Sequence, residues 1–325
     1  MAITLAEAKL NATTDLDISV IDEFRTNPIM DLITFDDAVN PAGGGATMTY
    51  GYRRLLTTAT AATRAINAEY APQNVTTQQY TVNLGVLGGS FDVDRVVAKI
   101  GPAASGSIAL NMSQKIKATQ AKFGDMVING DTAVDANGFD GLSKALTGSS
   151  TEDTVSRDWT GVMSQTLAFK ILTDVDDLLS TLDGAAGILL GNRKTMNLIK
   201  AASRFANQAV QVVGPRNTAL VSYAGAILQD AGLVAGSAAD VVPVNVTDPD
   251  GAGVLTAGST GLFAVRFGLD GFHGVSTAGG SLVQSWLPDF STAGAVKKGE
   301  VELGPVAVAL KASKAAGVFR NIKVQ

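Results

Sequence analysis

Hydrophobic and polar positions change their spacing several times along the chain, and each spacing predicts a different element. Between residues 103 and 128, apolar side chains recur every three or four positions, which predicts a long amphipathic helix. At 1.5 Å per residue this helix would span about 39 Å, and Asn129-Gly130 would end it. Its apolar face carries Ile108, Met112, Ile116, Phe123 and Val127.

Residues 46–84 follow another pattern, rich in Thr, Ala, Gln and Tyr and poor in large apolar side chains. Tyr80, Val82 and Leu84 alternate with polar residues, which is the period of a strand, and residues 71–74 form a turn candidate. The pattern predicts a long two-stranded arm. Because an isolated hairpin is marginally stable in water, we expect the arm to pack on another surface, with a neighbouring chain as the natural candidate.

The first 45 residues predict an extended arm with short helices. A helical stripe of Leu16, Val20 and Phe24 ends at Asn27-Pro28, and residues 29–35 form a short apolar docking stretch. The second half of the chain alternates helix and strand, which predicts a compact α+β domain. Its expected elements are helices over 167–182 and 193–204, strands over 187–190, 241–246, 262–267 and 301–310, and a final strand within 311–325.

Composition narrows the chemistry that this chain can perform. The 325 residues are 46% hydrophobic and 17% charged, so the chain can bury a core. It has no Cys, which excludes disulfides, thiol catalysis and Cys-ligated metals, and a single histidine, His273. The net charge of −5 argues against a general nucleic-acid coat. No signal peptide or membrane-length apolar run is visible, so we expect synthesis in the cytoplasm.

Charge is distributed unevenly, which is consistent with surfaces that face different neighbours or with ordinary variation of solvated faces. The net charge is −6 over residues 1–45, +2 over 46–85, 0 over 86–150, −5 over 151–290 and +4 over 291–325.

The sequence contains no convincing nucleotide or calcium motif. Residues 187–195 resemble a phosphate loop, but Arg193 replaces the glycine that must precede the lysine. The acidic loops around Gly138 and Gly251 lack EF-hand ligands at both ends, so we interpret them as Asx-turns.

The remaining reactive side chains also favour structural roles. His273 has no serine–acid partners in its motif and is interpreted as a surface or loop residue. Asp174, Asp176 and Asp177 are interpreted as a solvated helix face, although 174 and 177 could together hold a cation. We therefore predict no catalytic residue, no cofactor and no metal site, and a protein that acts through contacts.

The order of these segments resembles the HK97-type major capsid proteins of tailed bacteriophages. Five stretches carry the resemblance over nearly the whole chain: Phe24 to Phe35, Gly88 to Arg95, Asn129-Gly130-Asp131 with Gly138 to Leu142, Gly261 to Gly268, and Lys314 to Ile322. The resemblance implies an α+β capsid fold with an N-arm (1–45), an extended loop or E-loop (46–85), a peripheral domain (86–150 and 291–325) and an axial domain (151–290).

The same resemblance assigns roles to particular residues. The E-loop would lie over a neighbouring subunit and the N-arm would reach another, with inter-subunit contacts at Arg53, Arg54, Arg64, Glu69, Phe24 and Phe35. Two glycine groups would let the E-loop swing as hinges: Gly43, Gly44 and Gly45, and Gly85, Gly88 and Gly89. Lys115, Lys117 and Lys122 would form a basic face on the inner wall, or would simply solvate the helix.

The implied function is a shell of hexamers and pentamers, in a virion capsid, around double-stranded DNA held by weak, non-specific contacts. A separate scaffolding protein is expected, with portal and decoration proteins as further candidate partners and no membrane partner. The E-loop has no lysine, since none occurs between Lys9 and Lys99, so a lysine-based covalent weld is not expected. The alternatives are an encapsulin-like compartment around a cargo enzyme, and a soluble α+β enzyme with a deep polar pocket.

Overall fold

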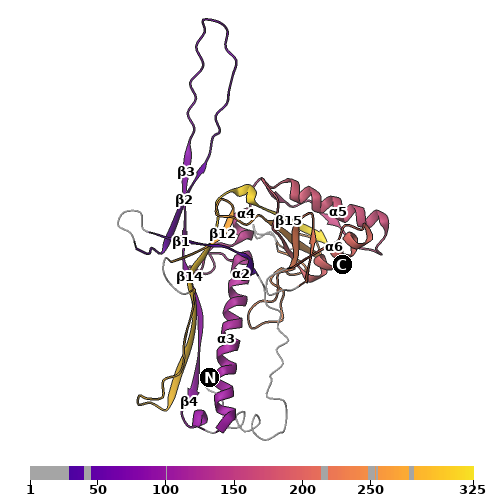
Figure 1. Ribbon diagram of the computed structural model, residues 1–325. Helices are drawn as coiled ribbons and strands as arrows, with labels where there is room; N and C mark the ends of the chain where they lie inside the picture. Colours follow the sequence, from indigo (N-terminus) through magenta and orange to yellow (C-terminus); the bar gives the residue numbers. More distant parts are fainter. Residues whose placement is uncertain are drawn as a thin grey trace.

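The computed structural model describes residues 29–39, 45–99, 101–213, 219–247, 253, 255–277 and 282–325. A body built on two sheets carries two long ribbons that leave it in opposite directions (Figure 1). One ribbon is β2 (Thr49–Leu55) with β3 (Thr77–Asn83), and the other is β4 (Gly85–Asp94) with β14 (Val296–Leu310). The predicted two-stranded arm is therefore present as β2 and β3.

The first sheet contains β4 and runs in the order β1-β12-β14-β13, with β4 paired to β14. β1 (Phe35–Ala38) lies parallel to β12 (Phe272–Thr277), and β14 is antiparallel to β12, to β13 (Val283–Trp286) and to β4. β14 is long enough to cross the body with its C-terminal half and to form the ribbon with its N-terminal half. This sheet therefore connects the body with the lower ribbon in Figure 1.

The predicted long helix is confirmed as α3 (Gly101–Asn129), which lies along the β4–β14 ribbon (Figure 1). Its two halves differ in burial. Phe123 and Val127 are fully buried, whereas Ile108, Met112 and Ile116 are only half-buried. The C-terminal half thus belongs to the core, and the N-terminal half supports the ribbon.

The second sheet has eight strands among the described residues, in the order β5-β15-β11-β7-β10-β9-β8, with β6 also on β15. Its strands are β5 (Glu152–Asp153), β6 (Arg157–Asp158), β7 (Ile188–Gly191), β8 (Val210–Val213), β9 (Ala219–Tyr223), β10 (Ala226–Asp230), β11 (Ser259–Val265) and β15 (Ala316–Lys323). Helices α5 (Gln165–Ser180) and α6 (Arg193–Phe205) pack on it, close to the predicted bounds. Four short helices complete the described elements: α2 (Ile29–Leu32), η1 (Val97–Lys99), α4 (Leu142–Leu146) and η3 (Ser313–Ala315).

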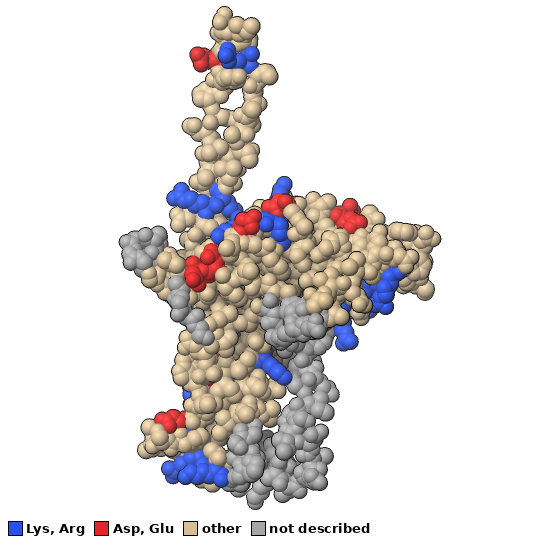
Figure 2. Space-filling model, in the orientation of Figure 1, with Lys and Arg blue, Asp and Glu red and all other residues tan. Residues whose placement is uncertain are grey.

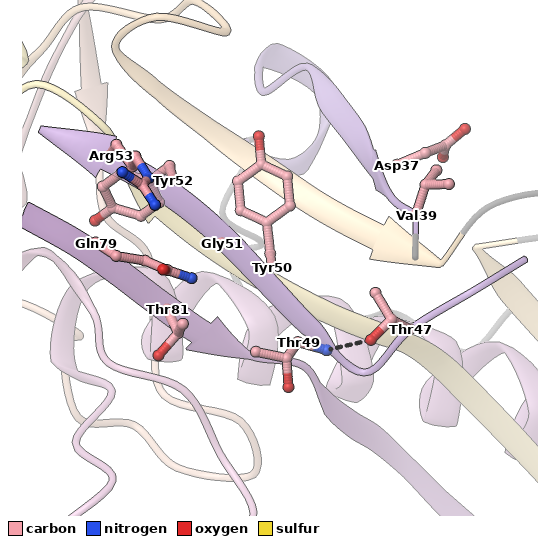
Figure 3. A pocket seen from close by; sticks show the side chains of 10 residues that line it. All are labelled: Asp37, Val39, Thr47, Thr49, Tyr50, Gly51, Tyr52, Arg53, Gln79 and Thr81. Atoms are coloured by element: carbon pink, nitrogen blue, oxygen red, sulfur yellow. Dashed lines mark hydrogen bonds between the residues drawn. The ribbon is translucent and has the colours of Figure 1, made fainter. Parts of the chain in front are cut away.

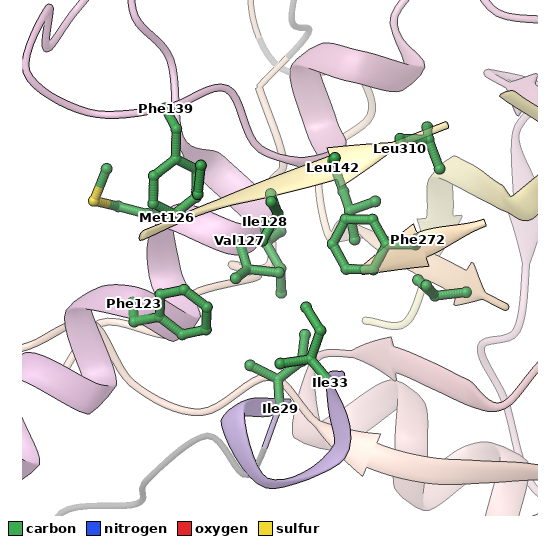
Figure 4. Close-up of a cluster of buried hydrophobic side chains, with 14 of the residues drawn as sticks. Ile29, Ile33, Phe123, Met126, Val127, Ile128, Phe139, Leu142, Phe272 and Leu310 are labelled. Atoms are coloured by element: carbon green, nitrogen blue, oxygen red, sulfur yellow. The ribbon is translucent and has the colours of Figure 1, made fainter. Parts of the chain in front are cut away.

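Two hydrophobic cores lie on opposite faces of this second sheet, because side chains alternate across a strand. Ile188 and Leu190 of β7 enter the core around α2 and α3, whereas Leu189 enters the core beneath α5 and α6. Figure 4 shows the first core, where Ile29 and Ile33 meet the end of α3. The predicted docking of residues 29–35 is therefore confirmed for these two side chains. β7 is buried on both faces, which explains why its sequence is a continuous apolar run.

The structure overturns one detail of the sequence interpretation. Residues 241–246 form bends and not a strand, although Val241 and Val242 are buried. The sheets join segments that the sequence assigned to different domains, since β15 pairs with β11 while β12 and β13 pair with β14, and the division into domains stays a prediction. Apolar alternation predicts a buried strand but does not specify its partner. In the described part of the chain, no helix is both long and apolar enough for a bilayer.

Candidate inter-subunit contact site

The β2–β3 hairpin is a regular ribbon near the body. All seven residues of each strand are paired, from Thr49↔Asn83 to Leu55↔Thr77. Tyr52 and Tyr80 face one another in this register and stack with their ring centroids 5.7 Å apart. The alternation predicted from the sequence is confirmed, since Tyr80 and Val82 are half-buried and their neighbours are exposed.

Beyond the paired strands, residues 56–76 form a tip without helix or strand, in which every side chain is exposed. Side-chain hydrogen bonds hold its two chains together: the Thr57 and Thr76 hydroxyls lie 3.0 Å apart, and Thr60 donates to Gln73. Large apolar groups nevertheless face solvent here, with Ile66 91% exposed and Tyr70 60% exposed. The tip therefore exposes apolar surface that the described part of its own chain does not cover.

The base of the hairpin is fixed to the body by a polar network, which we call the base latch: Asp36, Tyr50, His273 and Lys311. The Tyr50 hydroxyl donates to Asp36 Oδ2 at 2.6 Å, and His273 Nε2 lies 3.3 Å from the same hydroxyl. Lys311 Nζ is 3.7 Å from Asp36 Oδ2 and stands over the Tyr50 ring. The latch thus joins β1, β2, β12 and the end of β14.

The latch shifts the pKa of three of its members. The hydrogen bond from Tyr50 is the main reason that the pKa of Asp36 lies below its usual 3.8. Burial, followed by the bond to Asp36, raises the pKa of the Tyr50 hydroxyl well above its ordinary value. Burial lowers the pKa of His273, whose side chain faces Lys311 as well as Asp36. The described network therefore favours the ionised form of Asp36 and the neutral forms of Tyr50 and His273.

Two further side chains of β2 bind the end of β14. The Tyr52 hydroxyl donates to Leu310 O at 3.1 Å, and Arg54 Nε donates to Lys311 O at 2.8 Å. Arg54 Nη2 also donates to Leu310 O, and its guanidinium lies over the Tyr80 ring. Charge-assisted hydrogen bonds of this kind orient the hairpin relative to the body.

A hollow of about 500 Å³ lies beside the base latch, between β1 and the hairpin (Figure 3). Asp37, Val39, Tyr50, Arg53 and Gln79 are among the side chains that line it. The hollow is open to solvent, and its lining brings no nucleophile–base pair together. Within the described residues, no cluster of three or more His, Asp or Glu side chains has the form of a metal site.

The predicted contact residues have different surroundings. Arg53 is exposed, while Arg54 donates hydrogen bonds within its own chain, and their expected contacts with a neighbouring subunit stay predictions. Arg64 stacks on Tyr70 and donates to two tip carbonyls, and Glu69 is exposed at the tip.

The two phenylalanines that were predicted to contact neighbouring subunits also differ in what the structure shows of them. Phe35 packs against Phe123 inside the body, with ring centroids 6.0 Å apart, so its described contacts are internal. Its expected place in an inter-subunit contact stays a prediction, since the side chain is half-buried. Phe24 lies outside the described residues.

The predicted hinge glycines divide into two groups. Gly45 has a φ of +88° with open space around it, which suits a joint, while Gly43 and Gly44 lie outside the described residues. Gly88 and Gly89 are paired within β4, and a Cβ at Gly88 would lie 2.5 Å from Val301 O. Gly85 is equally confined, with Asn137 O 2.7 Å from such a Cβ. Gly85 and Gly88 therefore permit close packing, whereas a Cβ at Gly89 would meet only the Lys115 side chain, at 3.4 Å, and the hinge role of the three stays a prediction.

The three predicted lysines do not share one face of α3. At about 100° per residue, Lys115 and Lys122 lie on one side of the helix and Lys117 on the opposite side. Lys115 packs next to Gly89 of β4, and Lys122 lies 3.7 Å from Asp125. Only Lys115 and Lys122 therefore share a side of α3, and the inner-wall role stays a prediction.

Other sequence interpretations are settled by direct contacts. His273 is fully buried on β12, which corrects its expected surface position, and its buried apolar neighbour Phe272 was the available signal. Trp159 Nε1 donates to Asp174, and the Tyr223 hydroxyl donates to Asp176, so two of the three aspartates have structural partners. In the loop around Gly138, Asp131 and Asp135 accept hydrogen bonds from backbone amides two residues later, which confirms Asx-turns.

The base latch itself was not predicted from the sequence. Asp36 lies in the N-terminal segment, Tyr50 in the hairpin and His273 far along the chain. Local patterns carry no information on contacts at such separations.

Comparison with known proteins gives similarity in structure alone. Neither a protein-family model nor a curated protein sequence matches the chain. The holo-SrpI encapsulin complex from Synechococcus elongatus PCC 7942 is similar with a TM-score of 0.61 at 13% identity, covering 100% of this chain and 98% of that chain. The capsid of Myoviridae Phage XM1 gives a TM-score of 0.56 at 9% identity, with 98% and 99% covered. The capsid of the native GTA particle gives 0.58 at 12%, with 98% and 97% covered.

At these identities, the shared property is the fold. The three structures are a phage capsid, a GTA capsid and an encapsulin, and each is covered almost from end to end. The chain therefore has the α+β HK97-type fold that the sequence resemblance implied.

Proposed function

We propose that this chain is a major capsid protein, which assembles into the hexamers and pentamers of an icosahedral shell around double-stranded DNA. The observation that carries this proposal is the hairpin tip, which exposes apolar side chains on a ribbon without support from the described body. A surface of this kind is characteristic of a contact with another protein. The HK97-type fold supports the same conclusion, since it is the fold of shell-forming proteins.

The assembly mechanism rests on the difference between tip and base. The base latch and Arg54 fix the direction of the hairpin in the free chain, so the tip is presented in a defined orientation. On a neighbouring copy, the tip would bury Ile66 and Tyr70, while Arg53 and Glu69 would set the register. Ordering of the tip costs conformational entropy, which a shared interface must offset. Assembly therefore orders the tip and buries its apolar surface in one step.

The division of the chain into N-arm, E-loop, peripheral and axial segments supplies the rest of this proposal. Residues 1–45 would act as the N-arm and 46–85 as the E-loop. Residues near 151–290 would surround the axis of each hexamer or pentamer. A separate scaffolding protein would guide assembly, portal and decoration proteins are further candidate partners, and DNA contacts at Lys115 and Lys122 would be weak. Because the described hairpin contains no lysine, hot detergent should release single chains from the shell.

An encapsulin-like compartment is the second candidate, and a specific observation favours it. The encapsulin complex is similar over the whole chain with a TM-score of 0.61, which is no lower than the values of the two capsids reported above. The gene neighbourhood separates the two functions. Terminase and portal genes beside this gene would indicate a virus, and a gene for a cargo enzyme would indicate a compartment.

The direct test compares the full chain with a variant in which a short Gly-Ser turn replaces residues 56–76. We expect the wild type to form rings or closed shells in electron microscopy and in sedimentation. The variant should keep the melting temperature of the body but remain monomeric, because it lacks the tip. A wild type that stays monomeric at all concentrations, or a variant that assembles normally, would contradict the proposal.

A further inference from the structure

The hollow between β1 and the hairpin has the features of a docking surface. Figure 3 shows Asp37 and Val39 at one end of it and Arg53 with Gln79 towards the other, with the exposed Gly51 between them. Because glycine has no side chain, β2 leaves a gap in the middle of the hollow. A hollow of about 500 Å³ can receive a few side chains of a partner, but not a whole domain.

Each end of the hollow carries a charged side chain that its own chain does not use. Asp37 and Arg53 are exposed, and neither side chain forms a hydrogen bond or an ion pair with a described residue. Thr47 N donates to Ala38 O, which places Asp37 beside the start of β2, whereas Arg53 lies near the end of that strand. Val39, 52% exposed, adds apolar surface at the acidic end. Opposite charges at separate ends would fix the direction in which a partner binds.

The hairpin tip carries a matching set of side chains. Arg64 and Glu69 are the only charged residues between 56 and 76, and Figure 2 shows basic and acidic atoms together at the far end of the ribbon. Ile66 lies between them in the sequence and Tyr70 follows, and both are exposed. The Glu69 side chain forms no hydrogen bond or ion pair with a described residue. The tip thus presents one base, one acid and apolar groups, which complement the acid, the base and the apolar end of the hollow.

The tip cannot reach the hollow of its own chain. The paired strands from Thr49 to Leu55 separate the two, and Figure 1 shows the ribbon extended away from the body. A partner that carries this set of side chains is therefore a second copy. Since tip and hollow are different surfaces of one chain, their contact is head-to-tail, and its repetition can close a ring.

We propose that the hollow of one copy receives the hairpin tip of the next copy around each hexamer and pentamer. Arg53 would then pair with Glu69 of the next copy. At the other end, Asp37 would pair with Arg64 of that copy, and the apolar groups of the tip would fill the gap at Gly51. This inference rests on the proposed shell function and names the surface that receives the tip. Apolar burial would supply most of the affinity, while the exposed ion pairs would set the register.

Filling the hollow is the first test. Gly51→Phe places a large side chain in the gap, and the fold accepts a Cβ there because the nearest atom is Gln79 Nε2 at 3.6 Å. The monomer should keep its melting temperature, but assembly should need about tenfold more protein in sedimentation, because the tip is excluded. The matched control Thr77→Phe adds the same bulk at an exposed position of β3 outside the hollow and should assemble as the wild type does. Equal loss in this control, or normal assembly of Gly51→Phe, would overturn the proposal.

Exchange of charges tests the register. R53E and E69R each bring like charges together across the contact, so each should raise the protein concentration needed for assembly about fivefold. R53E/E69R restores the attraction in reverse and should assemble at the wild-type concentration. The controls K314E and D177R make the same changes of charge on exposed side chains of the body and should have no effect. A double variant that does not recover, or controls with an equal effect, would contradict the pairing.

Disulfide trapping identifies the occupant of the hollow, since the chain contains no native cysteine. After mild oxidation of the assembled protein, V39C/I66C should give covalent ladders of up to six copies, because each bond joins two copies. V162C/I66C, with the first cysteine at another exposed valine, should give none. Bonds from V39C to F24C in place of I66C would show that the N-terminal segment occupies the hollow, and would overturn the proposal.

The same experiments separate this contact from the shell function. A wild type without rings would refute the shell function itself. A wild type with rings, together with insensitive variants and no V39C/I66C ladder, would refute only the contact between tip and hollow.

Discussion

The two long ribbons of this molecule have similar geometry but opposite support. The β4–β14 ribbon is covered by α3, and Phe91 of β4 is 9% exposed against Gly299 of β14. The β2–β3 ribbon leaves the body without a helix beside it, and its tip exposes Ile66 to 91%. Since an isolated hairpin is marginal in water, the second ribbon needs an external surface that the first finds within its own chain. One ribbon thus completes the fold, and the other is available for assembly.

The largest expected contrast comes from truncating one apolar side chain on each ribbon. Phe91→Ala should lower the free energy of unfolding by about 2–4 kcal/mol, because it leaves a cavity between β4, β14 and α3. Ile66→Ala should change it by less than about 0.5 kcal/mol, because Ile66 makes no buried contact in the free chain. Urea denaturation of the unassembled protein measures both. Equal losses would mean that the tip is packed within the monomer.

Glycine-to-alanine substitutions should also destabilise the two ribbons to different extents, although the difference should be smaller than for the apolar truncations. Gly88→Ala places a methyl group 2.5 Å from Val301 O, so it should cost about 1–3 kcal/mol in the supported ribbon. Gly51→Ala in β2 meets only ordinary contacts, the nearest atom being Gln79 Nε2 at 3.6 Å, and should be close to neutral. Thermal melting of the two variants provides the comparison. A tolerated Gly88→Ala that alters only shell curvature would support the hinge interpretation.

The arginines of β2 test how the unsupported ribbon is oriented. Arg54→Ala removes two bonds to the end of β14 and should lower the local opening free energy of the hairpin base by about 1–2 kcal/mol. Hydrogen exchange of the amides of β2 and β3 should accelerate about tenfold. Arg53→Ala, on the neighbouring exposed side chain, is the matched control and should leave exchange in the monomer unchanged. If both variants behave alike, Arg54 does not orient the hairpin.

The smallest expected effect is a pH dependence at the base latch. Burial depresses the pKa of His273 from its ordinary 6.5, so below that pH the unfolded chain binds the proton more readily than the folded chain. Stability should therefore be highest above about pH 6.5 and should fall as the pH drops from there towards the folded pKa, below which it levels off. Asp36 does not contribute in this window, because its pKa lies below 3.8.

Melting temperatures between pH 8 and pH 5 measure this effect. His273 is the chain's only histidine, so a His273→Gln variant should lose most of the slope. An unchanged slope in that variant would show that His273 does not cause the pH dependence of stability.

Local patterns predicted most elements because their periods are local properties. The apolar spacing of α3, the polar alternation of β3 and the all-apolar run of β7 each identified an element that the structure contains. Strand partners were not predictable in the same way. β15 lies beside β11, from an earlier segment; it is buried along almost its whole length, but no local signal identifies that partner.

The sequence predicted where the hairpin lies along the chain, but not which of its side chains bind the body. The sequence located the hairpin and its bases, yet it could not distinguish Arg54, which binds β14, from Arg53, which is exposed. The glycines of β4 suggested flexibility, although the positions of Val301 and Asn137 require their small size. In each case the deciding atom belongs to a residue distant in the chain.

The most direct test of the central claim is hydrogen exchange of residues 56–76 in free and assembled protein. We predict rapid exchange at the tip in the monomer and at least tenfold slower exchange in the shell, while β4 and β14 are protected in both. Equal protection of the tip in the two states, or a tip that remains unprotected after assembly, would contradict a hairpin that is completed by a neighbouring copy.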